Sequence, residues 1–173
     1  MSDFHQFGPI TALPLLVARS TEDMEGRIES LAERFPVSLV IPLVPSEMDR
    51  PALARILDEL SRVRYLDSLV LSLNHASFDE YHRALDYFDR YPGRKVILWN
   101  ESPAVEGFVE EMTAAGLYTG EPGKGRACWL AIGQVLAEER AAYIAFQDAD
   151  VVNFSRSMLA RLVLPAVEPT VDF

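Results

Sequence analysis

The chain has 173 residues, 49% of them hydrophobic and 24% charged, with 16 Lys and Arg against 26 Asp and Glu. A chain of this length is expected to form one domain with a hydrophobic core of its own. Its net charge of -10 disfavours non-specific binding to nucleic acid or to anionic membranes, because both require a basic surface. The single cysteine, Cys128, excludes an internal disulfide and a cysteine-rich zinc site.

The longest apolar run, residues 39–44, contains Pro42 and is far shorter than the roughly 20 residues of a membrane-spanning helix. Residues 1–7 have no basic region ahead of an apolar stretch, so they are not expected to be a signal peptide. We therefore expect a cytoplasmic protein without an integral membrane segment.

The first 35 residues are expected to form an irregular arm, residues 1–20, followed by a charged amphipathic helix, residues 21–34. The segment 37–42 is short, rich in β-branched residues and bounded by prolines, which predicts a strand buried on both faces. Asp49, two residues before Pro51, is placed to cap a helix whose apolar residues recur at helical spacing.

The alternation of a short apolar strand with a helix repeats along the rest of the chain. Three more strands are predicted, at residues 68–73, 95–99 and 143–146. Helices are expected after the capping box Ser77–Glu80, across residues 105–112 as far as Gly116, after a glycine-rich loop at 120–125, and after Ser155. Crossovers of about 20 residues imply a mainly parallel sheet with helices on both faces. We predict a Rossmann-like α/β domain over residues 36–173.

Ligands of open parallel sheets bind beyond the carboxyl ends of the strands, near the point where the strand order reverses. Four segments meet that condition: 42–47, 73–77, 100–102 and 147–153. The loop at 120–125 joins them if its helix begins at the same edge of the sheet.

Asp148 and Asp150 are the strongest candidates, because they follow a predicted buried strand with one residue between them. Two carboxylates in this arrangement can ligate a hard divalent cation, and a cation shared with a diphosphate neutralises the charge of a leaving nucleotide. An Asp-x-Asp triplet also arises by chance roughly once in a chain of this composition. The alternative interpretation is a pair of solvated loop carboxylates.

Gly123-Lys124-Gly125 lies where a helix is expected to begin. Glycines allow backbone N–H groups to approach an anion, and a helix N-terminus and a lysine both favour negative charge. The segment is not a Walker A loop, because the glycine spacing differs and Gly125 follows the lysine. The alternative is an ordinary loop with an exposed lysine.

Asn74, at the end of the second predicted strand, is a candidate hydrogen-bonding group for a nucleobase or ribose; the alternative is that it only turns the chain. His75 and His82 are expected to be surface residues, because neither has a carboxylate or cysteine at ligand spacing, and Cys128 is expected to be a buried apolar residue. The sequence contains no Gly-x-Ser-x-Gly, His-Glu-x-x-His or dinucleotide glycine fingerprint, which disfavours hydrolase, zinc-protease and dehydrogenase functions.

Several of these segments together resemble a known family. The strand VSLVIPLV, the Gly-Lys-Gly loop and the strand that runs into Asp-Ala-Asp resemble the nucleotide-sugar half of a GT-A glycosyltransferase. More narrowly, GKGRACWLAIG, FQDADVVNFSRSMLARLVLP and EPTVDF resemble the retaining glucosyl-/mannosyl-3-phosphoglycerate synthase-like family. The resemblance covers residues from about 36 to 173 and implies a GT-A nucleotide-diphospho-sugar-binding domain.

The resemblance implies transfer of a hexose from a UDP- or GDP-hexose to a small acceptor such as a glycerate derivative, with retention and with Mg²⁺ or Mn²⁺. The matching positions take their roles from the family, as follows. Pro42, Leu43 and Val44 would line the nucleobase pocket, Asn74 would stand near the base, Lys124 between Gly123 and Gly125 would contact the nucleotide-sugar, and Asp148 and Asp150 would belong to the metal motif, with Asp148 also near the ribose.

Three departures from the family pattern bear on this interpretation. The family often continues its first strand with Ala-Leu-Asn-Glu, so Glu47 is only a loose counterpart here. Asn74 stands where the family usually has an aspartate, which changes the groups offered to the base. The chain stops at Phe173, where family members continue into an acceptor-binding half and a further metal-ligand histidine. It is therefore expected to be truncated or completed by a partner chain, and no catalytic residue is assigned.

Two other interpretations are considered: a non-catalytic nucleotide- or nucleotide-sugar-binding domain that is inactive alone, and an α/β interaction module in which Asp148 and Asp150 are surface carboxylates. A domain without its acceptor half is also expected to expose apolar surface and to self-associate as a homo-oligomer. Candidate residues for that surface are Leu162, Val163, Leu164, Val167 and Phe173.

Overall fold

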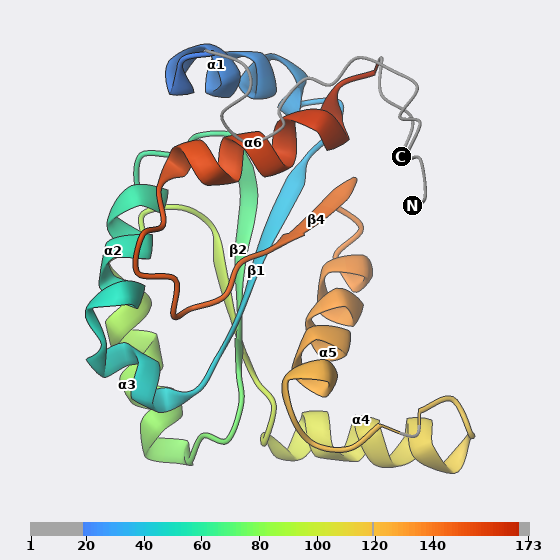
Figure 1. Ribbon diagram of the computed structural model, residues 1–173. Helices are drawn as coiled ribbons and strands as arrows, with labels where there is room; N and C mark the ends of the chain where they lie inside the picture. Colours follow the sequence, from blue (N-terminus) through green and yellow to red (C-terminus); the bar gives the residue numbers. More distant parts are fainter. Residues whose placement is uncertain (1–18, 119, 170–173) are drawn as a thin grey trace, which may run out of the picture.

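The computed structural model of the chain describes residues 19–118 and 120–169 (Figure 1). Most of the expected N-terminal arm, and Phe173, lie outside these residues. Four strands, β1 Val37–Leu43, β2 Leu66–Leu73, β3 Lys95–Trp99 and β4 Tyr143–Phe146, form a sheet in the order β3-β2-β1-β4. Every strand pair is parallel, so the carboxyl ends share one edge. The predicted parallel α/β fold is confirmed.

Helices cover both faces of the sheet, as predicted. Their bounds are α1 Thr21–Ala32, α2 Pro51–Leu60, α3 Phe78–Phe88, α4 Pro103–Ala114, α5 Lys124–Ala137 and α6 Arg156–Val167, with a short 3₁₀ helix η1 at Pro45–Asp49. Successive strand residues point to opposite faces. Leu39 and Leu71 pack in the main core with α1, α2, α3 and α6, whereas Val40 and Val70 pack against Ala131 of α5. Over the described residues, no helix combines the length and the apolar character that crossing a membrane requires.

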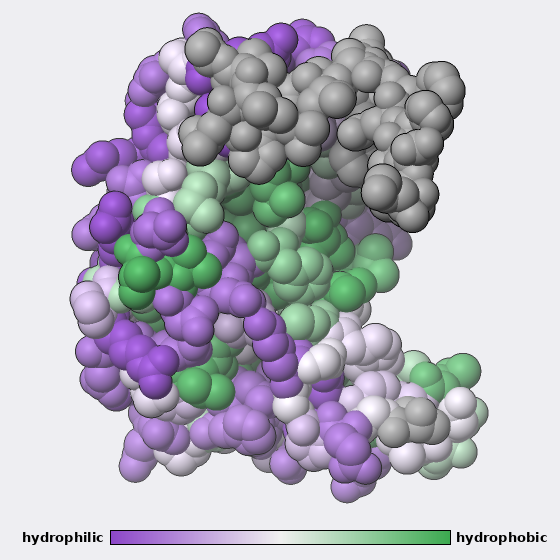
Figure 2. All heavy atoms as spheres, viewed as in Figure 1, coloured by the Kyte–Doolittle hydropathy of each residue, from purple (hydrophilic) through white to green (hydrophobic). Residues whose placement is uncertain are grey.

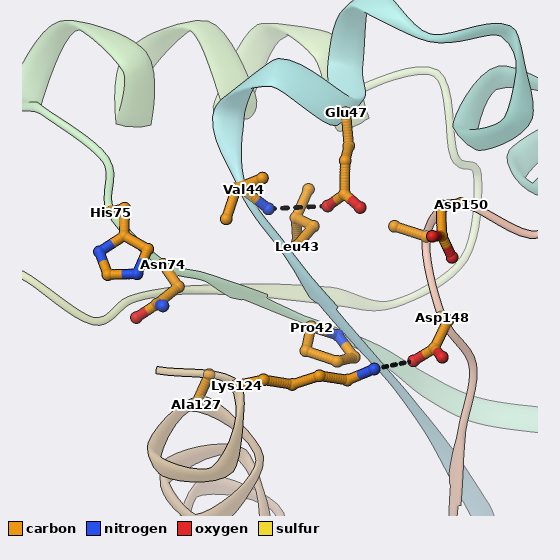
Figure 3. Close-up of a pocket in the computed structure, with 11 residues that line it drawn as sticks. Pro42, Leu43, Val44, Glu47, Asn74, His75, Lys124, Ala127, Asp148 and Asp150 are labelled. Atoms are coloured by element: carbon orange, nitrogen blue, oxygen red, sulfur yellow. Dashed lines mark hydrogen bonds and ion pairs between the residues drawn. The ribbon is translucent and has the colours of Figure 1, made fainter. Parts of the chain in front are cut away.

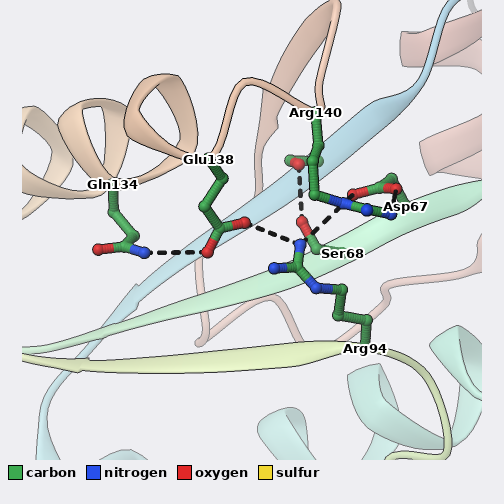
Figure 4. A network of polar contacts seen from close by, with 7 residues as sticks. Asp67, Ser68, Arg94, Gln134, Glu138 and Arg140 are labelled. Carbon is green, nitrogen blue, oxygen red and sulfur yellow. Dashed lines mark hydrogen bonds and ion pairs between the residues drawn. The ribbon is translucent and has the colours of Figure 1, made fainter.

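Contacts at both ends of α5 set the position of its first residue, Lys124. Near the N-terminal end, the hydroxyl of Ser72, buried in β2, donates to the carbonyl of Ala127 at 2.9 Å. Just beyond the C-terminal end, the Glu138 carboxylate pairs with Arg94 at 2.8 Å, within the polar network of Figure 4. These contacts hold the start of α5 against β2 and its end against Arg94, the residue before β3.

Local sequence signals place most helix starts. Ser77 caps α3 in the predicted capping box, in which the Ser77 hydroxyl accepts from the Glu80 N–H and the Glu80 carboxylate accepts from the Ser77 N–H. The predicted cap at Asp49 is wrong, because Arg50 holds the N-cap position of α2. Asp49 ends η1 instead, and its carboxylate pairs with Arg83 of α3.

Ser155 holds the N-cap position of α6, as predicted, but it makes no side-chain capping hydrogen bond. A carboxylate oxygen of Glu59 in α2 accepts from the Arg156 N–H at 3.0 Å instead. The Arg156 side chain also pairs with Glu25 and Glu22 of α1, at 2.5 and 2.7 Å. These polar contacts accompany the side-by-side packing of α1 and α6 over the sheet (Figure 1).

The packing of α6 corrects the prediction of its exposed apolar surface. Val163, Leu164 and Val167 are 2%, 0% and 1% exposed, because they belong to the main core that α6 shares with α1. Leu162 is 55% exposed. Figure 2 shows apolar surface around β4, an edge strand of the sheet. Self-association stays a prediction, resting now on Leu162 and on this surface.

Candidate functional site

A pocket of about 240 Å³ opens at the carboxyl edge of the sheet (Figure 3). It lies where β1 has β2 on one side and β4 on the other, which is the reversal point at which open α/β sheets bind ligands. Its wall is formed by Pro42, Leu43, Val44, Glu47, Asn74, His75, Lys124, Ala127, Asp148, Ala149 and Asp150. The fold thus brings together residues that follow three different strands and residues of the first turn of α5.

Lys124 is the first residue of α5 and reaches across the pocket to the loop after β4 (Figure 3). Its Nζ lies 2.6 Å from Asp148 Oδ1, and the hydrogen bond to Asp148 raises the pKa of Lys124. Gly123 before it has a φ of 151°, a conformation that favours glycine. The predicted loop at 120–125 is therefore shorter than expected, because the helix already begins at Lys124 and includes Gly125.

Asp148 and Asp150 flank Ala149 in the loop after β4. Ala149 is 3% exposed and packs in the main core, while the exposed carboxylates on either side of it line the pocket. The first residue of the loop is still hydrogen-bonded to the sheet, because the Gln147 N–H donates to the carbonyl of Val40 in β1 at 3.0 Å. The two carboxylates therefore have a defined place at the edge of the sheet.

This carboxylate pair fits a divalent cation that is also held by a bound ligand. Carboxylate oxygens are ligands that Mg²⁺ and Mn²⁺ prefer. In this structure Asp148 already has a cationic partner, the ammonium group of Lys124. Among the described residues, no three His, Cys, Asp or Glu side chains gather closely enough to hold a metal by themselves. Two protein carboxylates suit a cation that completes its coordination with phosphate and water oxygens.

Glu47 lines the pocket from η1. One oxygen of its carboxylate accepts from the Val44 N–H at 2.8 Å (Figure 3), which holds the turn that follows β1. The apolar part of the wall comes from the end of β1 and the residue after it, Pro42, Leu43 and Val44. Predominantly apolar walls with a few placed polar groups are typical of small-molecule sites.

Asn74 is 5% exposed, and its Oδ1 has no hydrogen-bond partner among the described residues. Its N–H donates to the Leu43 carbonyl at 2.9 Å and so extends the pairing of β1 with β2. A buried amide oxygen without a partner costs free energy in the folded protein unless a ligand or a water satisfies it. Asn74 is thus an acceptor in the pocket wall that a ligand can satisfy.

His75 lies in the segment 73–77 that was expected at the ligand-binding edge, but the sequence gave it no binding role. It is exposed, as expected, but it lines the pocket and has a φ of 57°, which is uncommon for a residue other than glycine. The carboxylate of Glu101, which follows β3, accepts from the N–H groups of His75 and Ala76 at 2.8 and 3.2 Å. The only signal for Glu101 in the sequence is its place at the end of a strand.

The remaining candidates lie around the pocket or away from it. Gly123 and Gly125 flank Lys124 but are not among the lining residues. His82 lies on α3, outside the lining, with its ring edge-on to Phe78. Cys128 is half-buried rather than buried, and its burial raises the pKa of its thiol, which disfavours the reactive thiolate.

The parallel sheet, its pocket at the reversal point and the Asp-x-Asp loop define a Rossmann-like domain of the GT-A type. No family model matches the chain. A glucosyl-3-phosphoglycerate synthase from Persephonella marina is 36% identical over 173 residues, which are 100% of this chain and 43% of that protein. A protein of the same name from Methanococcoides burtonii is 31% identical over 153 residues, 88% of this chain and 37% of that protein.

Solved structures show the same fold. The crystal structure of glucosyl-3-phosphoglycerate synthase from Mycobacterium tuberculosis in complex with Mn²⁺, UDP and glucosyl-3-phosphoglycerate matches with a TM-score of 0.56 at 20% identity, over 92% of this chain and 48% of that one. Another structure, of a mycobacterial protein, matches with a TM-score of 0.53 at 20% identity, over 87% and 41%. The chain is thus homologous to the glucosyl-3-phosphoglycerate synthases, as its motifs suggested, and it spans less than half of the length of these relatives.

Proposed function

We propose that the chain is the donor-binding part of a metal-dependent hexosyltransferase that uses a nucleotide diphosphate sugar. The observation that carries this proposal is that Lys124 and the loop with Asp148 and Asp150 meet in one pocket. A lysine at a helix start favours a diphosphate, and paired carboxylates favour Mg²⁺ or Mn²⁺. The names of the relatives support a glycerate-type acceptor. Retention of the anomeric configuration, a UDP- or GDP-linked donor and a cytoplasmic location complete the proposal.

In this proposal the pocket holds the donor by its nucleotide. Pro42 and its two successors pack against the base, and Asn74 Oδ1 accepts a hydrogen bond from the base or the ribose. The Lys124 ammonium and the free N–H groups in the first turn of α5 hold the diphosphate. A divalent cation held by Asp148 and Asp150 would supply neutralisation of the charge that develops on the leaving nucleotide.

The size of the pocket favours a second candidate, a nucleotide-sugar-binding domain that turns nothing over by itself. Its volume of about 240 Å³ is below the roughly 300–1,000 Å³ of typical small-molecule pockets. A hollow of this size suits the nucleotide part of a donor better than a donor and an acceptor together. Binding and turnover therefore need separate measurements.

The binding test is calorimetry of the chain with UDP, GDP and their glucose conjugates, with and without Mn²⁺. We expect binding that requires Mn²⁺, that is lost in Asp150→Ala and that is weakened at least about tenfold in Lys124→Ala, since each substitution removes a charged contact to the ligand. Asp58→Ala and Lys95→Ala are the matched controls, because Asp58 is exposed on α2 and Lys95 begins β3 at the opposite edge of the sheet.

A nucleotide affinity that is the same with and without Mn²⁺, or that is unchanged in Asp150→Ala, would contradict the proposal. If the chain binds a donor, release of the free nucleotide in the presence of a phosphoglycerate-type acceptor then separates the two candidates. Turnover supports the hexosyltransferase, whereas tight binding without turnover supports the binding domain.

A further inference from the structure

The contact between Lys124 and Asp148 joins the two groups to which the proposed function gives different ligands. Lys124 would hold the diphosphate and Asp148 the cation, yet in the free protein Nζ and Oδ1 bind each other at 2.6 Å. Both side chains belong to the pocket wall, and Figure 3 shows the lysine extended across the pocket to reach the carboxylate. While this pair is intact, Lys124 Nζ and Asp148 Oδ1 are partners of each other, and a ligand that takes either atom competes with the pair.

The pair is held by charge and not by packing. The side chains of Lys124 and Asp148 are 65% and 53% exposed. Exposed ion pairs contribute little free energy, and the long lysine side chain retains several accessible rotamers. A ligand that binds either group more strongly than the two groups bind each other can therefore open the pair without disturbing the core.

Neither ligand is well placed to open the pair alone. The ionised side chains of the pocket wall are one lysine and three carboxylates, those of Glu47, Asp148 and Asp150. A cation alone must displace the Lys124 ammonium and then remain close to it. A diphosphate alone can attract Lys124, but it leaves the carboxylates uncovered beside its own negative charge.

We propose that the Lys124–Asp148 ion pair is a latch that a nucleoside diphosphate and a divalent cation open together, so that each ligand raises the affinity for the other. The inference rests on the proposed function of the pocket. When both ligands bind, Lys124 moves to a phosphate oxygen and Asp148 turns to the cation. Every charge that was paired in the closed pocket then has a new partner, and linkage makes the gain in affinity equal for the two ligands.

The test begins with Mn²⁺ alone, so that it does not depend on nucleotide binding or on turnover. Titration of Lys124→Met with Mn²⁺, followed by electron paramagnetic resonance of the free ion, is expected to show an affinity about fivefold or more above that of the unsubstituted chain. A lysine that serves only as a phosphate ligand predicts no such gain. UDP, added in a second titration, should then raise the Mn²⁺ affinity of Lys124→Met by a smaller factor than that of the unsubstituted chain.

Arg126→Met is the matched control, because Arg126 carries the same charge in the same turn of α5 and forms no ion pair with Asp148 in the structure. It is expected to leave the Mn²⁺ affinity within about twofold. An equal gain in Arg126→Met overturns the latch, because the effect then comes from net charge alone. An equal Mn²⁺ affinity in Lys124→Met and the unsubstituted chain, including no measurable binding to either, also overturns it. Metal-dependent nucleotide binding lost in Asp150→Ala would meanwhile still support the proposed function.

Discussion

The turn after β2 shows how one pocket residue depends on a side chain from another strand. His75 has a φ of 57°, and the Glu101 carboxylate holds the N–H groups of His75 and Ala76. In Glu101→Ala both donors lose a charged acceptor, so we expect the free energy of unfolding to fall by about 1–3 kcal/mol. Nucleotide affinity should fall as well, because His75 and its neighbour Asn74 line the pocket. Chemical denaturation and calorimetry measure the two effects.

Substitution of His75 in the same background separates backbone strain from the lost hydrogen bonds. Glycine adopts a positive φ without strain, so His75→Gly should return part of the stability that Glu101→Ala loses. Glu101→Gln, which keeps an acceptor oxygen, should lose less stability than Glu101→Ala. If Glu101→Ala leaves both the stability and the nucleotide affinity unchanged, the turn does not need this carboxylate.

At the level of single residues, chain order predicted the positions that follow a strand directly. Asp148 was found in this way, because the carboxyl ends of parallel strands must share one edge. Lys124 was found instead from the glycines on either side of it at the expected start of a helix, and its place at this edge depended on where that helix begins. The support that Glu101 gives to His75 is a contact across 26 positions of the chain. Such a contact exists only once β2 and β3 have paired, and no local spacing encodes it.

The start of α5 is the element on which the position of Lys124 depends. Gly123 precedes it with a φ of 151°, whereas Gly125 lies inside the helix with no positive φ. A Cβ added at either glycine meets no atom within 4 Å, so backbone conformation decides the outcome at both positions. We expect Gly123→Ala to lower the free energy of unfolding by about 1–3 kcal/mol, and Gly125→Ala to raise it by about 0.4–1 kcal/mol.

The same two variants differ in ligand binding. Gly123→Ala should also weaken nucleotide binding, because relief of its strain shifts the first turn of α5 and with it Lys124. Thermal denaturation and calorimetry of this pair test the prediction, and equal stability changes of the same sign would contradict it. The sequence alone predicted a loop through Gly125, because a segment rich in glycine is usually read as a loop. Here the helix has already begun at Lys124.

At the scale of the whole molecule, the strand–helix alternation predicted a parallel sheet covered on both faces. It did not predict that α6, the last helix of the described chain, packs beside α1, the first. This packing helps to bury Val163, Leu164 and Val167. An amphipathic helix shows which of its faces is apolar, but it does not show which distant helix will cover that face. The pairing of two helices more than 100 residues apart follows from tertiary packing alone.

The contact between α1 and α6 contains a buried charge that makes the stability of the fold depend on pH. Glu25 is 6% exposed, and burial raises its pKa above the usual 4.5 even though Arg156 lies beside it and lowers it. The folded protein therefore holds this proton more tightly than the unfolded chain. The stability that Glu25 contributes is fully present below about pH 4.5 and is lost as the pH rises through the raised pKa of the folded state.

Glu25→Gln removes this titration and keeps the shape of the side chain. The free energy of unfolding of Glu25→Gln, relative to that of the unsubstituted chain, is therefore expected to increase from about pH 4 to about pH 7, because only the unsubstituted chain loses stability as the raised pKa of Glu25 is passed. Urea denaturation of the two proteins at both pH values gives the difference, in which the titrations that they share cancel. A relative stability that instead falls toward pH 7 would mean that the pair with Arg156 outweighs the cost of burying the carboxylate, and that α1 and α6 are held together by that charge.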